Sequence, residues 1–465
     1  MMKPDRPSAA RILACLDLSL EHLLKTAHRR AQRIRRPVLT SASVVLEDEG
    51  TLQHLLPLTR HMPQWTSFAS EAQRIVTWGA AARIRDNADL FSVKASWSEL
   101  VANAVRDELT EQISGPILIF GRSFAEEHNS QGLWRLFGRS RAIVPWISIR
   151  EHNNRLVATA SVVVGQNDAP LDAGRGQTEP SSQAPPPPVD AETAFLAAAE
   201  KAIARLRLGE AEKVVLARSV RVETGATDPL AILGRLDVRY PQTCRFAISL
   251  SGTTFLGATP ELLCSVQGRT ARTMALAGSI PAGAGDAAAL SDPKLRREHS
   301  IVAEHIEQAL RPRSDTITMD PEPAVVSLSN IRHLRTDFRA TLTHPASVLD
   351  VAQWLHPTPA IGGCPTPEAY SLIRELEGFD RGWYTGPVGW TDAAGDGDCW
   401  VTLRCALLTE SAAYLFAGAG IVRDSDPTME LAETNWKLAA MLEALGLLPP
   451  EAERQTASQF KNMFS

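Results

Sequence analysis

The chain has 465 residues, of which 44% are hydrophobic and 22% charged, and its formal net charge is −5. These values are typical of a globular protein with a large core, and they exclude a generally basic surface for nucleic acid. The six cysteines include no Cys-x-x-Cys pair, and a chain of this length needs no disulfide framework. No apolar run approaches the roughly 18 residues of a membrane span, and the N-terminus lacks a signal-peptide core. We therefore predict a cytoplasmic protein with reduced thiols and no membrane partner.

The first third of the chain contains helical and strand patterns in turn. Residues 10–34 carry leucines on one helical face, and residues 97–109 also have a helical period. Apolar runs predict strands at 37–45, 75–78, 116–120, 142–149 and 155–164, with the last two paired. We assign residues 1–167 to the N-terminal half of the fold.

A change of composition follows this region. Residues 168–190 lose all apolar periodicity and include the run Pro185–Pro188. We interpret the segment as a solvated loop or linker with polyproline character. The main functional region is then predicted at 191–450, followed by a C-terminal tail at 451–465.

The pattern is denser after this segment. Helices are predicted at 191–208, 228–239, 293–311, 347–354 and 367–377, with a final helix after 426. Strands are predicted at 213–219, 244–249, 254–257, 261–266, 272–275, 324–327, 332–341, 384–392, 399–408 and 413–422. Because the strands and helices come in blocks, they favour a mixed α/β (α+β) architecture over a doubly wound one.

The most informative segment lies near the C-terminus. Gly418-Ala419-Gly420 is interpreted as a strand that ends in a glycine turn, whose backbone N–H groups can hold an anion. A helix then begins, with Asp426 as its cap and Pro427 in its first position. Its polar face carries three residues at helical spacing, Glu430, Glu433 and Lys437. Its packing face is predicted to comprise Met429, Ala432, Trp436 and Ala439.

A second helix has the same opening, Ser291-Asp292-Pro293, and carries Glu298. Mg²⁺ prefers a few carboxylates, several waters and a substrate oxygen to a cage made wholly of protein. Glu298 and Glu433 fit that need, and Glu430 would lie behind them, ordering a water or adding charge. The two helices therefore predict a Mg²⁺ site and an acidic substrate, although a lone helix of this kind would indicate only a solvated face.

Two further residues could move protons. Lys213 opens an apolar strand, where burial would favour the neutral amine and make it a usable base. Glu261 follows the turn at 257–260 and would be a general acid if it were buried. Taken singly, each also has an ordinary interpretation, as a strand-end lysine and an exposed turn glutamate.

Small and polar residues mark three more segments. Gly278 and Ser279 end a strand in small side chains, which let the backbone approach a ligand closely. His356 lies in a loop with two prolines and two glycines, and could donate a hydrogen bond to a substrate oxygen. Arg404 is expected in the middle of a strand, where it could pair with a substrate carboxylate, and Tyr384 could add a phenol donor.

In this order, the segments resemble the chorismate-utilising enzymes, and within them the isochorismate synthase branch. The matching stretches are KVVLARS (213–219), GATPELL (257–263), ALAGS (275–279), EH (298–299), LHPTPAIGGCP (355–365), YTGPVGW (384–390) and VTLRCAL (401–407). The last match, over 418–437, consists of GAGIV (418–422), SDP (425–427), Glu430, ET (433–434) and Lys437. The resemblance covers roughly residues 191–446, and the residues before 166 are similar to the more variable half of that family.

The resemblance implies one large unit with two sheets packed face to face, a sandwich-like core and helices outside. It implies Mg²⁺ bound by Glu298 and Glu433, holding the ring carboxylate of chorismate. Lys213 would take a proton from the water that attacks ring carbon 2, and Glu261 would protonate the hydroxyl that leaves carbon 4. Gly278 would lie against the ring, and His356 near the polar edge of the substrate. The carboxylates would be held by Tyr384, Arg404, Lys437 and the backbone of Gly418, Ala419 and Gly420.

Several alternatives accompany this isomerase interpretation. A salicylate synthase would go on to eliminate pyruvate from isochorismate, whereas a non-catalytic homologue would only bind chorismate or a partner. An unrelated Mg²⁺ phosphatase or polymerase would need an Asp-rich motif, which the sequence lacks. Relatives that use ammonia lack a lysine at the position of Lys213, so water is the expected nucleophile and no amidotransferase subunit is expected. We expect a monomer or homodimer whose product feeds menaquinone or siderophore synthesis.

Overall fold

The computed structural model describes residues 9–46, 52–84, 86–107, 115–126, 132–152, 155–165, 190–281, 286–328 and 331–448. The predicted proline-rich loop, apart from Asp190, and the predicted tail at 451–465 lie outside these residues. No helix in the described ranges is both long and apolar enough to cross a membrane.

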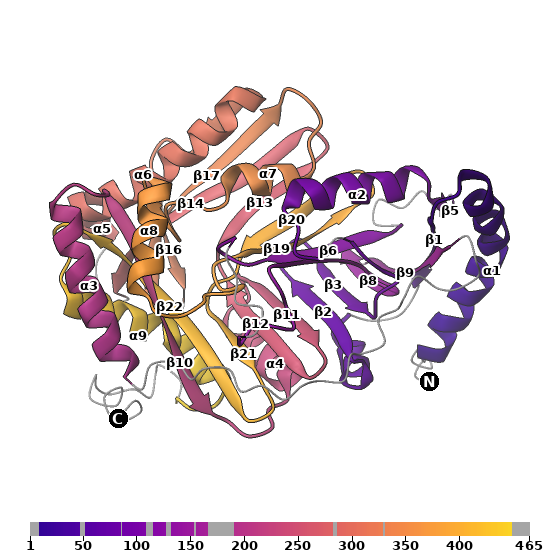
Figure 1. Cartoon of the computed structure of the whole chain (residues 1–465), viewed down its shortest axis with the longest axis horizontal. Helices are drawn as coiled ribbons and strands as arrows, with labels where there is room; N and C mark the ends of the chain where they lie inside the picture. The colour runs from indigo at the N-terminus through magenta and orange to yellow at the C-terminus, as the bar shows by residue number, and fades with distance from the viewer. Residues whose placement is uncertain are drawn as a thin grey trace, which may run out of the picture.

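Two large sheets form the centre of the molecule (Figure 1). The first sheet has the order β18 (Gly363–Cys364), β10 (Lys213–Glu223), β22 (Ala412–Val422), β21 (Cys405–Leu408), β12 (Thr253–Thr259), β11 (Cys244–Leu250), β2 (Gln64–Ala69), β3 (Arg74–Trp78), β8 (Ile147–His152), β9 (Arg155–Val164), β1 (Val38–Leu46) and β5 (Val105–Arg106). The second has the order β15 (Ser314–Met319), β17 (Ile331–Leu342), β14 (Thr270–Pro281), β13 (Leu262–Gln267), β20 (Gly397–Val401), β19 (Pro387–Asp392), β6 (Ile117–Arg122), β7 (Ser140–Val144) and β4 (Ala82–Arg83), with β16 (Ala324–Leu328) also paired to β17.

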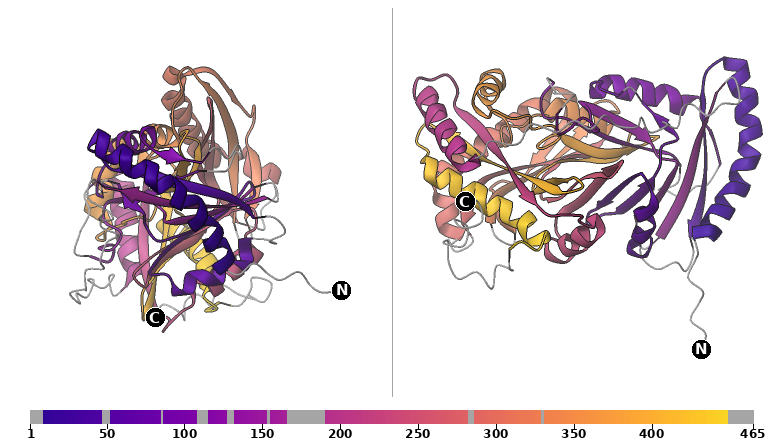
Figure 2. Two further views of the ribbon diagram at one scale, coloured as in Figure 1. Left: turned by 90° about the vertical axis from the view of Figure 1, so that its right-hand side faces the viewer. Right: turned by 60° about the horizontal axis from the view of Figure 1, so that its bottom comes forward.

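Helices cover the outer faces of the sheets (Figures 1 and 2). They are α1 (Ala9–Ile34), α2 (Leu90–Ala102), α3 (Ala191–Arg207), α4 (Pro229–Arg239), α5 (Asp286–Ser291), α6 (Pro293–Leu310), α7 (Val348–Leu355), α8 (Thr366–Leu376) and α9 (Pro427–Ala444). Helix α1 lies against β1 and β9, whereas α3 and α8 pack on β10 and α6 packs on β14. The predicted mixed architecture of two packed sheets with helices outside is confirmed.

Alternating side chains of the central strands build two separate layers of core. On β6, Ile117 and Ile119 join an aromatic cluster that includes residues of both sheets, such as Phe68. The rings of Phe68 on β2 and Trp400 on β20 stack across the sheets with centroids 5.4 Å apart. Leu118 and Phe120 belong instead to the cluster shared with α2 and α7. In such central strands, this period of two places one face between the sheets and the other under helices.

Strands from early and late in the chain are neighbours in both sheets. Residues of β2 pair with β11, and those of β6 pair with β19. Figure 1 shows these contacts as purple strands beside pink and yellow ones. The N-terminal half predicted at 1–167 therefore shares both sheets with the region that follows it.

Several predicted elements differ from the observed ones. The helix expected at 97–109 is α2, which begins earlier because the Asp89 side chain accepts a hydrogen bond from Ser92 N. The strand expected at 142–149 divides into β7 and β8, which belong to different sheets, and only β8 pairs with β9. The strand expected at 399–408 divides into β20 and β21, again in different sheets. Arg404 has a φ of +48° at this second break, so it is not the mid-strand arginine that the sequence predicted.

Candidate active site

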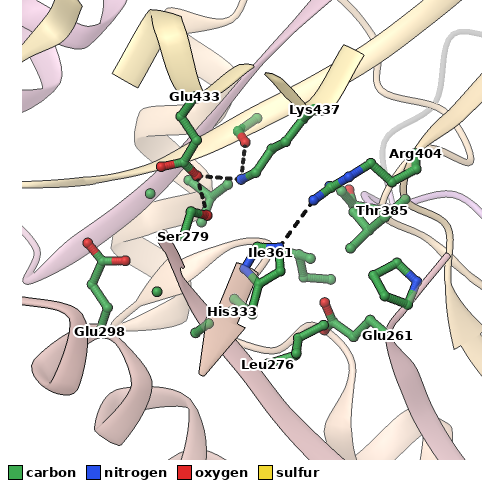
Figure 3. Close-up of a pocket in the computed structure, with 18 of the residues that line it drawn as sticks. Glu261, Leu276, Ser279, Glu298, His333, Ile361, Thr385, Arg404, Glu433 and Lys437 are labelled. Carbon is green, nitrogen blue, oxygen red and sulfur yellow. Dashed lines mark hydrogen bonds and ion pairs between the residues drawn. The ribbon is translucent and has the colours of Figure 1, made fainter. Parts of the chain in front are cut away.

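One cavity collects residues from both sheets and from two helices (Figure 3). Strands β10 and β22 contribute from the first sheet, β14 and β17 from the second, and α6 and α9 contribute polar side chains. The residues predicted for a site that line it are Lys213, Glu261, Gly278, Ser279, Glu298, Tyr384, Arg404, Gly418, Gly420, Glu433 and Lys437. Residues as far apart in the sequence as Lys213 and Lys437 are thus brought to one place.

The two carboxylate helices begin as their sequences indicate. Asp292 caps α6 by accepting from Lys294 N and Leu295 N, and Asp426 caps α9 through Thr428 N and Met429 N. A proline follows each cap, where its missing N–H costs nothing. These caps fix where each helix starts, and therefore which turn carries its glutamates.

The predicted packing face of α9 is confirmed at Ala439, which is buried, and is wrong at Met429. Met429 is 59% exposed, whereas Glu430 and Thr434 are buried. The buried positions continue at Leu438 and Met441, three or four residues apart, so the inward face includes the polar residues. The sheet and cavity lie on this side of the helix, and they determine which face is covered.

Glu433 is held by a compact network at one end of the cavity. Its Oε1 accepts from Ser279 Oγ at 2.7 Å and lies 2.6 Å from Lys437 Nζ. Lys437 Nζ also donates to the carbonyl oxygen of Gly418 at 2.8 Å (Figure 3). Burial acts to raise the pKa of Glu433, but Lys437 and Ser279 outweigh it and hold the pKa below its usual value. Glu433 is therefore an anion.

Glu298 lies at the same end of the cavity as Glu433 in Figure 3. It is 8% exposed, and burial raises its pKa. Lys213 opposes this rise and Glu433 adds to it, so the three charges influence one another across the cavity. Lys213 is itself only 2% exposed, as expected for the buried mouth of β10.

Gly418-Ala419-Gly420 does not form the predicted turn. These residues lie inside β22 and pair with Ala217, Leu216 and Val215 of β10. A Cβ on Gly420 would stand 2.9 Å from Lys213 Cε and 3.4 Å from its Nζ. The glycine therefore leaves room for the Lys213 side chain to enter the cavity. Ala419 is fully buried in the core and does not line the cavity.

The strand expected to end near Ala275 continues to Pro281 with an irregularity at Gly278. The β14–β17 register shifts between Ala277 and Ser279, and Gly278 has a φ of +78°. A side chain would be strained there and would also meet Leu295 of α6. The bulge precedes Ser279, whose hydroxyl reaches Glu433.

Glu261 lies at the other end of the cavity, near Arg404 in Figure 3. It is 4% exposed, and burial raises its pKa to about 7 even though Arg404, Lys437 and Lys213 act to lower it. A carboxyl group with this pKa carries a proton about half of the time at neutral pH. It has the property that the sequence interpretation required of a general acid.

His333 on β17 lines the cavity and was missed by the sequence analysis. Arg404 Nη2 donates to its Nε2 at 3.2 Å, which requires the imidazole to accept at that nitrogen. Burial and the charge of Arg404 lower the pKa of His333 well below its usual value, so it is neutral. Its place on a predicted strand was a weak signal, because nothing local distinguishes it from a packed histidine.

His356 does not line this cavity. Its Nε2 donates to the carbonyl oxygen of Thr385 at 3.0 Å, and burial lowers its pKa to about 3. Thr385 lines the cavity and has a φ of +61°. It therefore occupies the position from which His356 was expected to contact a substrate. The His356 imidazole thus holds the backbone of Thr385 in the cavity wall and does not itself reach the cavity. Ile361 is a further lining residue that the sequence analysis missed.

Two of the three predicted metal ligands have the donor chemistry that a Mg²⁺ ion requires. Glu430 is held by Lys294, with Nζ to Oε1 at 3.1 Å, and does not line the cavity. Within the described ranges no cluster of three or more His, Cys, Asp or Glu side chains could hold a metal ion. Glu298 and Glu433 nevertheless both face the cavity as oxygen donors, and Mg²⁺ needs only one or two carboxylates when waters and a substrate complete its shell.

Fold, cavity and sequence together define the class of protein. The chain belongs to the family of chorismate-binding enzymes, which matches residues 24–446. A salicylate biosynthesis isochorismate synthase of Pseudomonas aeruginosa is 32% identical over 94% of this chain and 97% of its own length. The isochorismate synthase EntC of Escherichia coli K12 is 37% identical over 55% of this chain and 68% of its own. The solved structure of MenF, the menaquinone-specific isochorismate synthase of Escherichia coli, has the same fold, with a TM-score of 0.71 at 23% identity over 93% of this chain and 99% of that one.

Proposed function

We propose that this protein isomerises chorismate to isochorismate. The observation that carries the proposal is that Lys213, Glu261 and the carboxylates of Glu298 and Glu433 line a single cavity. This set combines a candidate base, a candidate acid and a metal site in a chain similar to isochorismate synthases. The reaction needs each of these functions, because hydroxide cannot leave carbon 4 easily without a proton.

The proposed chemistry divides between the two ends of the cavity. Lys213 accepts a proton from a water molecule as that water adds to ring carbon 2. Glu261 gives its proton to the hydroxyl group at carbon 4, which leaves as water while both ring double bonds shift by one position. Exchange with solvent then returns a proton to Glu261 and removes one from Lys213, so the atoms balance.

Cations around the cavity suit a dianionic substrate. Arg404 and Lys437 would each pair with a carboxylate, and Tyr384 would donate from its phenol. The backbone of β22 from Gly418 to Gly420 and the bulge at Gly278 would lie close to the ring. His333 would hold Arg404 in its orientation through their hydrogen bond. His356 would position the backbone of Thr385 and would not contact the substrate itself.

We further propose that Glu298 and Glu433 hold Mg²⁺, with Glu430 behind them. When bound, the ion would neutralise a substrate carboxylate and draw electron density from the ring. The Lys437–Glu433 contact keeps this carboxylate ionised and positioned before the metal arrives.

Incubation of the protein with chorismate and Mg²⁺, followed by chromatography of the products, tests the proposal. We expect isochorismate alone. Salicylate with pyruvate would instead indicate a salicylate synthase, and absence of any product from a folded, Mg²⁺-loaded sample would refute the enzymatic proposal. Chelation of the metal should stop turnover, and added Mg²⁺ should restore it.

A further inference from the structure

A second cavity of about 800 Å³ adjoins the candidate active site. Its lining includes Arg122, Phe124, His356, Tyr370 and Arg381. None of the residues to which we assign proton transfer or metal binding lines it. Its volume lies within the range of pockets that hold small molecules.

Arg122 is the unusual residue of this cavity. It ends β6, is 8% exposed, and has one weak hydrogen bond, from Nη1 to Gln353 Oε1 at 3.4 Å. Within the described ranges it makes no ion pair, and burial lowers its pKa. Tyr370 and then Glu126 oppose this lowering of the pKa, but Glu126, which also lines the cavity, is exposed and forms no ion pair with Arg122. Burial of a guanidinium without a carboxylate is costly, so an anionic partner would stabilise this site.

Arg381 provides a contrast within the same cavity. It forms a buried ion pair with Glu377 and donates to the carbonyl oxygens of Val215 and Ile361 at 2.7 and 2.9 Å. Its charge is therefore already balanced and its N–H groups are engaged. Arg374 also lines the cavity, but it is exposed. Of the two buried arginines in the lining, Arg122 is therefore the one that can offer a fork of N–H donors to a ligand.

Planar apolar groups stand beside Arg122. The rings of Phe124 and Tyr370 have centroids 4.8 Å apart, and the His356 ring meets Phe124 edge-on at 6.3 Å. His356 is neutral, so its ring adds a flat surface without a second charge. The Arg381 guanidinium already lies over one face of Phe124, 4.2 Å from the ring centroid. A ligand here would therefore meet the Arg122 guanidinium, the Tyr370 ring and the part of Phe124 that Arg381 leaves uncovered.

We propose that this cavity is a second ligand site, which binds a small cyclic carboxylate. The carboxylate would pair with Arg122, and the ring would lie against Phe124 and Tyr370. This site goes beyond the proposed reaction, but the two cavities share a wall. His356 and Arg381 line the second cavity and donate to the carbonyl oxygens of Thr385 and Ile361, which line the first.

Calorimetric titration with benzoate tests the proposal. Benzoate carries a ring and a carboxylate but could also enter the first cavity, so the titration is made on the whole chain and on three single variants. Arg122→Gln should weaken binding at the second site about tenfold or more, because a charged hydrogen-bond pair is lost. Arg404→Gln should leave that site unchanged, and Arg122→Lys should retain part of the affinity. Absence of binding in the unmodified protein, or binding that is lost in Arg404→Gln and kept in Arg122→Gln, would overturn the proposal.

A crystal of the unmodified protein soaked in 4-bromobenzoate provides a measurement that does not depend on whether a variant folds. Anomalous density beside Phe124 and Tyr370, with the carboxylate at Arg122, supports the proposal. Density confined to the cavity around Arg404, or no density at either place, contradicts it.

Discussion

Glu261 shows how burial can set the chemistry of a single residue. Three cations act on its carboxyl group, yet desolvation outweighs them and raises its pKa from 4.5 to about 7. The carboxyl group therefore keeps its proton between pH 4.5 and 7, where an exposed glutamate would have lost it. At neutral pH the protonated and ionised forms are both well populated.

The pH dependence of turnover should report the ionisation of the Glu261 carboxyl group. Because the protonated form is the one that we propose to be active, kcat/KM for chorismate should fall as pH rises through 7, approaching about tenfold per unit. Measurement between about pH 6 and 9 checks the slope. Glu261→Gln cannot donate an acidic proton and should lose the activity at every pH. A flat profile in this range would exclude Glu261 as the acid.

Lys213→Ala should abolish turnover and leave chorismate binding intact. Loss of a general base costs typically about 10² to 10⁴ in rate, whereas the substrate carboxylates still meet Arg404 and Lys437. Steady-state kinetics and calorimetric binding measure the two effects separately. Lys294→Ala is the matched control, because that lysine pairs with Glu430 and does not line the cavity. Equal losses in both variants would remove the case for Lys213.

At the scale of elements, α6 and α9 bring the proposed metal ligands together. Glu433→Gln should raise the Mg²⁺ concentration needed for activity, or end activity, because a neutral amide is a poor ligand for a hard cation. Activity titrated with Mg²⁺ measures the shift. Glu430→Gln changes the same helix one turn away and should have a smaller effect. A Glu433→Gln enzyme with unaltered Mg²⁺ dependence would refute the ligand assignment.

The pair Arg381–Glu377 joins α8 and the loop after it to strand β10. Both side chains are at most 3% exposed, and Glu377 Oε1 also accepts from Ala217 N at 2.8 Å. Arg381→Met leaves a buried carboxylate unpaired, so we expect the free energy of unfolding to fall by about 3–5 kcal/mol. Urea unfolding measures the change. The double variant Arg381→Met with Glu377→Gln should recover part of it, and no recovery would mean that packing, not charge, is lost.

At the scale of the whole molecule, both sheets contain strands from early and late in the chain. The segment expected to be a linker begins after β9 and ends at Asp190, whose side chain caps α3. Removal of 170–188 should leave the melting temperature and the activity nearly unchanged, because that segment has no apolar pattern to bury. An insoluble or strongly destabilised product would show that the segment packs against the sheets.

The sequence by itself determined the local features of this protein. The caps at Asp292 and Asp426 and the β11–β12 hairpin depend on neighbours within a few positions. Such contacts can be recognised from residue type and spacing alone. The order of motifs also sufficed to indicate the family, because it needs no knowledge of where each segment lies in space.

Only the tertiary structure decided which side chains meet. Ser279 and Glu433 are 154 positions apart and Arg404 and His333 are 71 apart, so no local pattern could join them. The packing of two sheets divided the strand at Arg404, turned the glutamates of α9 inward and placed Thr385 in front of His356. Each outcome depends on which distant segments compete for the same buried space. The apolar spacing of two residues in a strand or 3.6 in a helix describes one segment and carries no information about that competition.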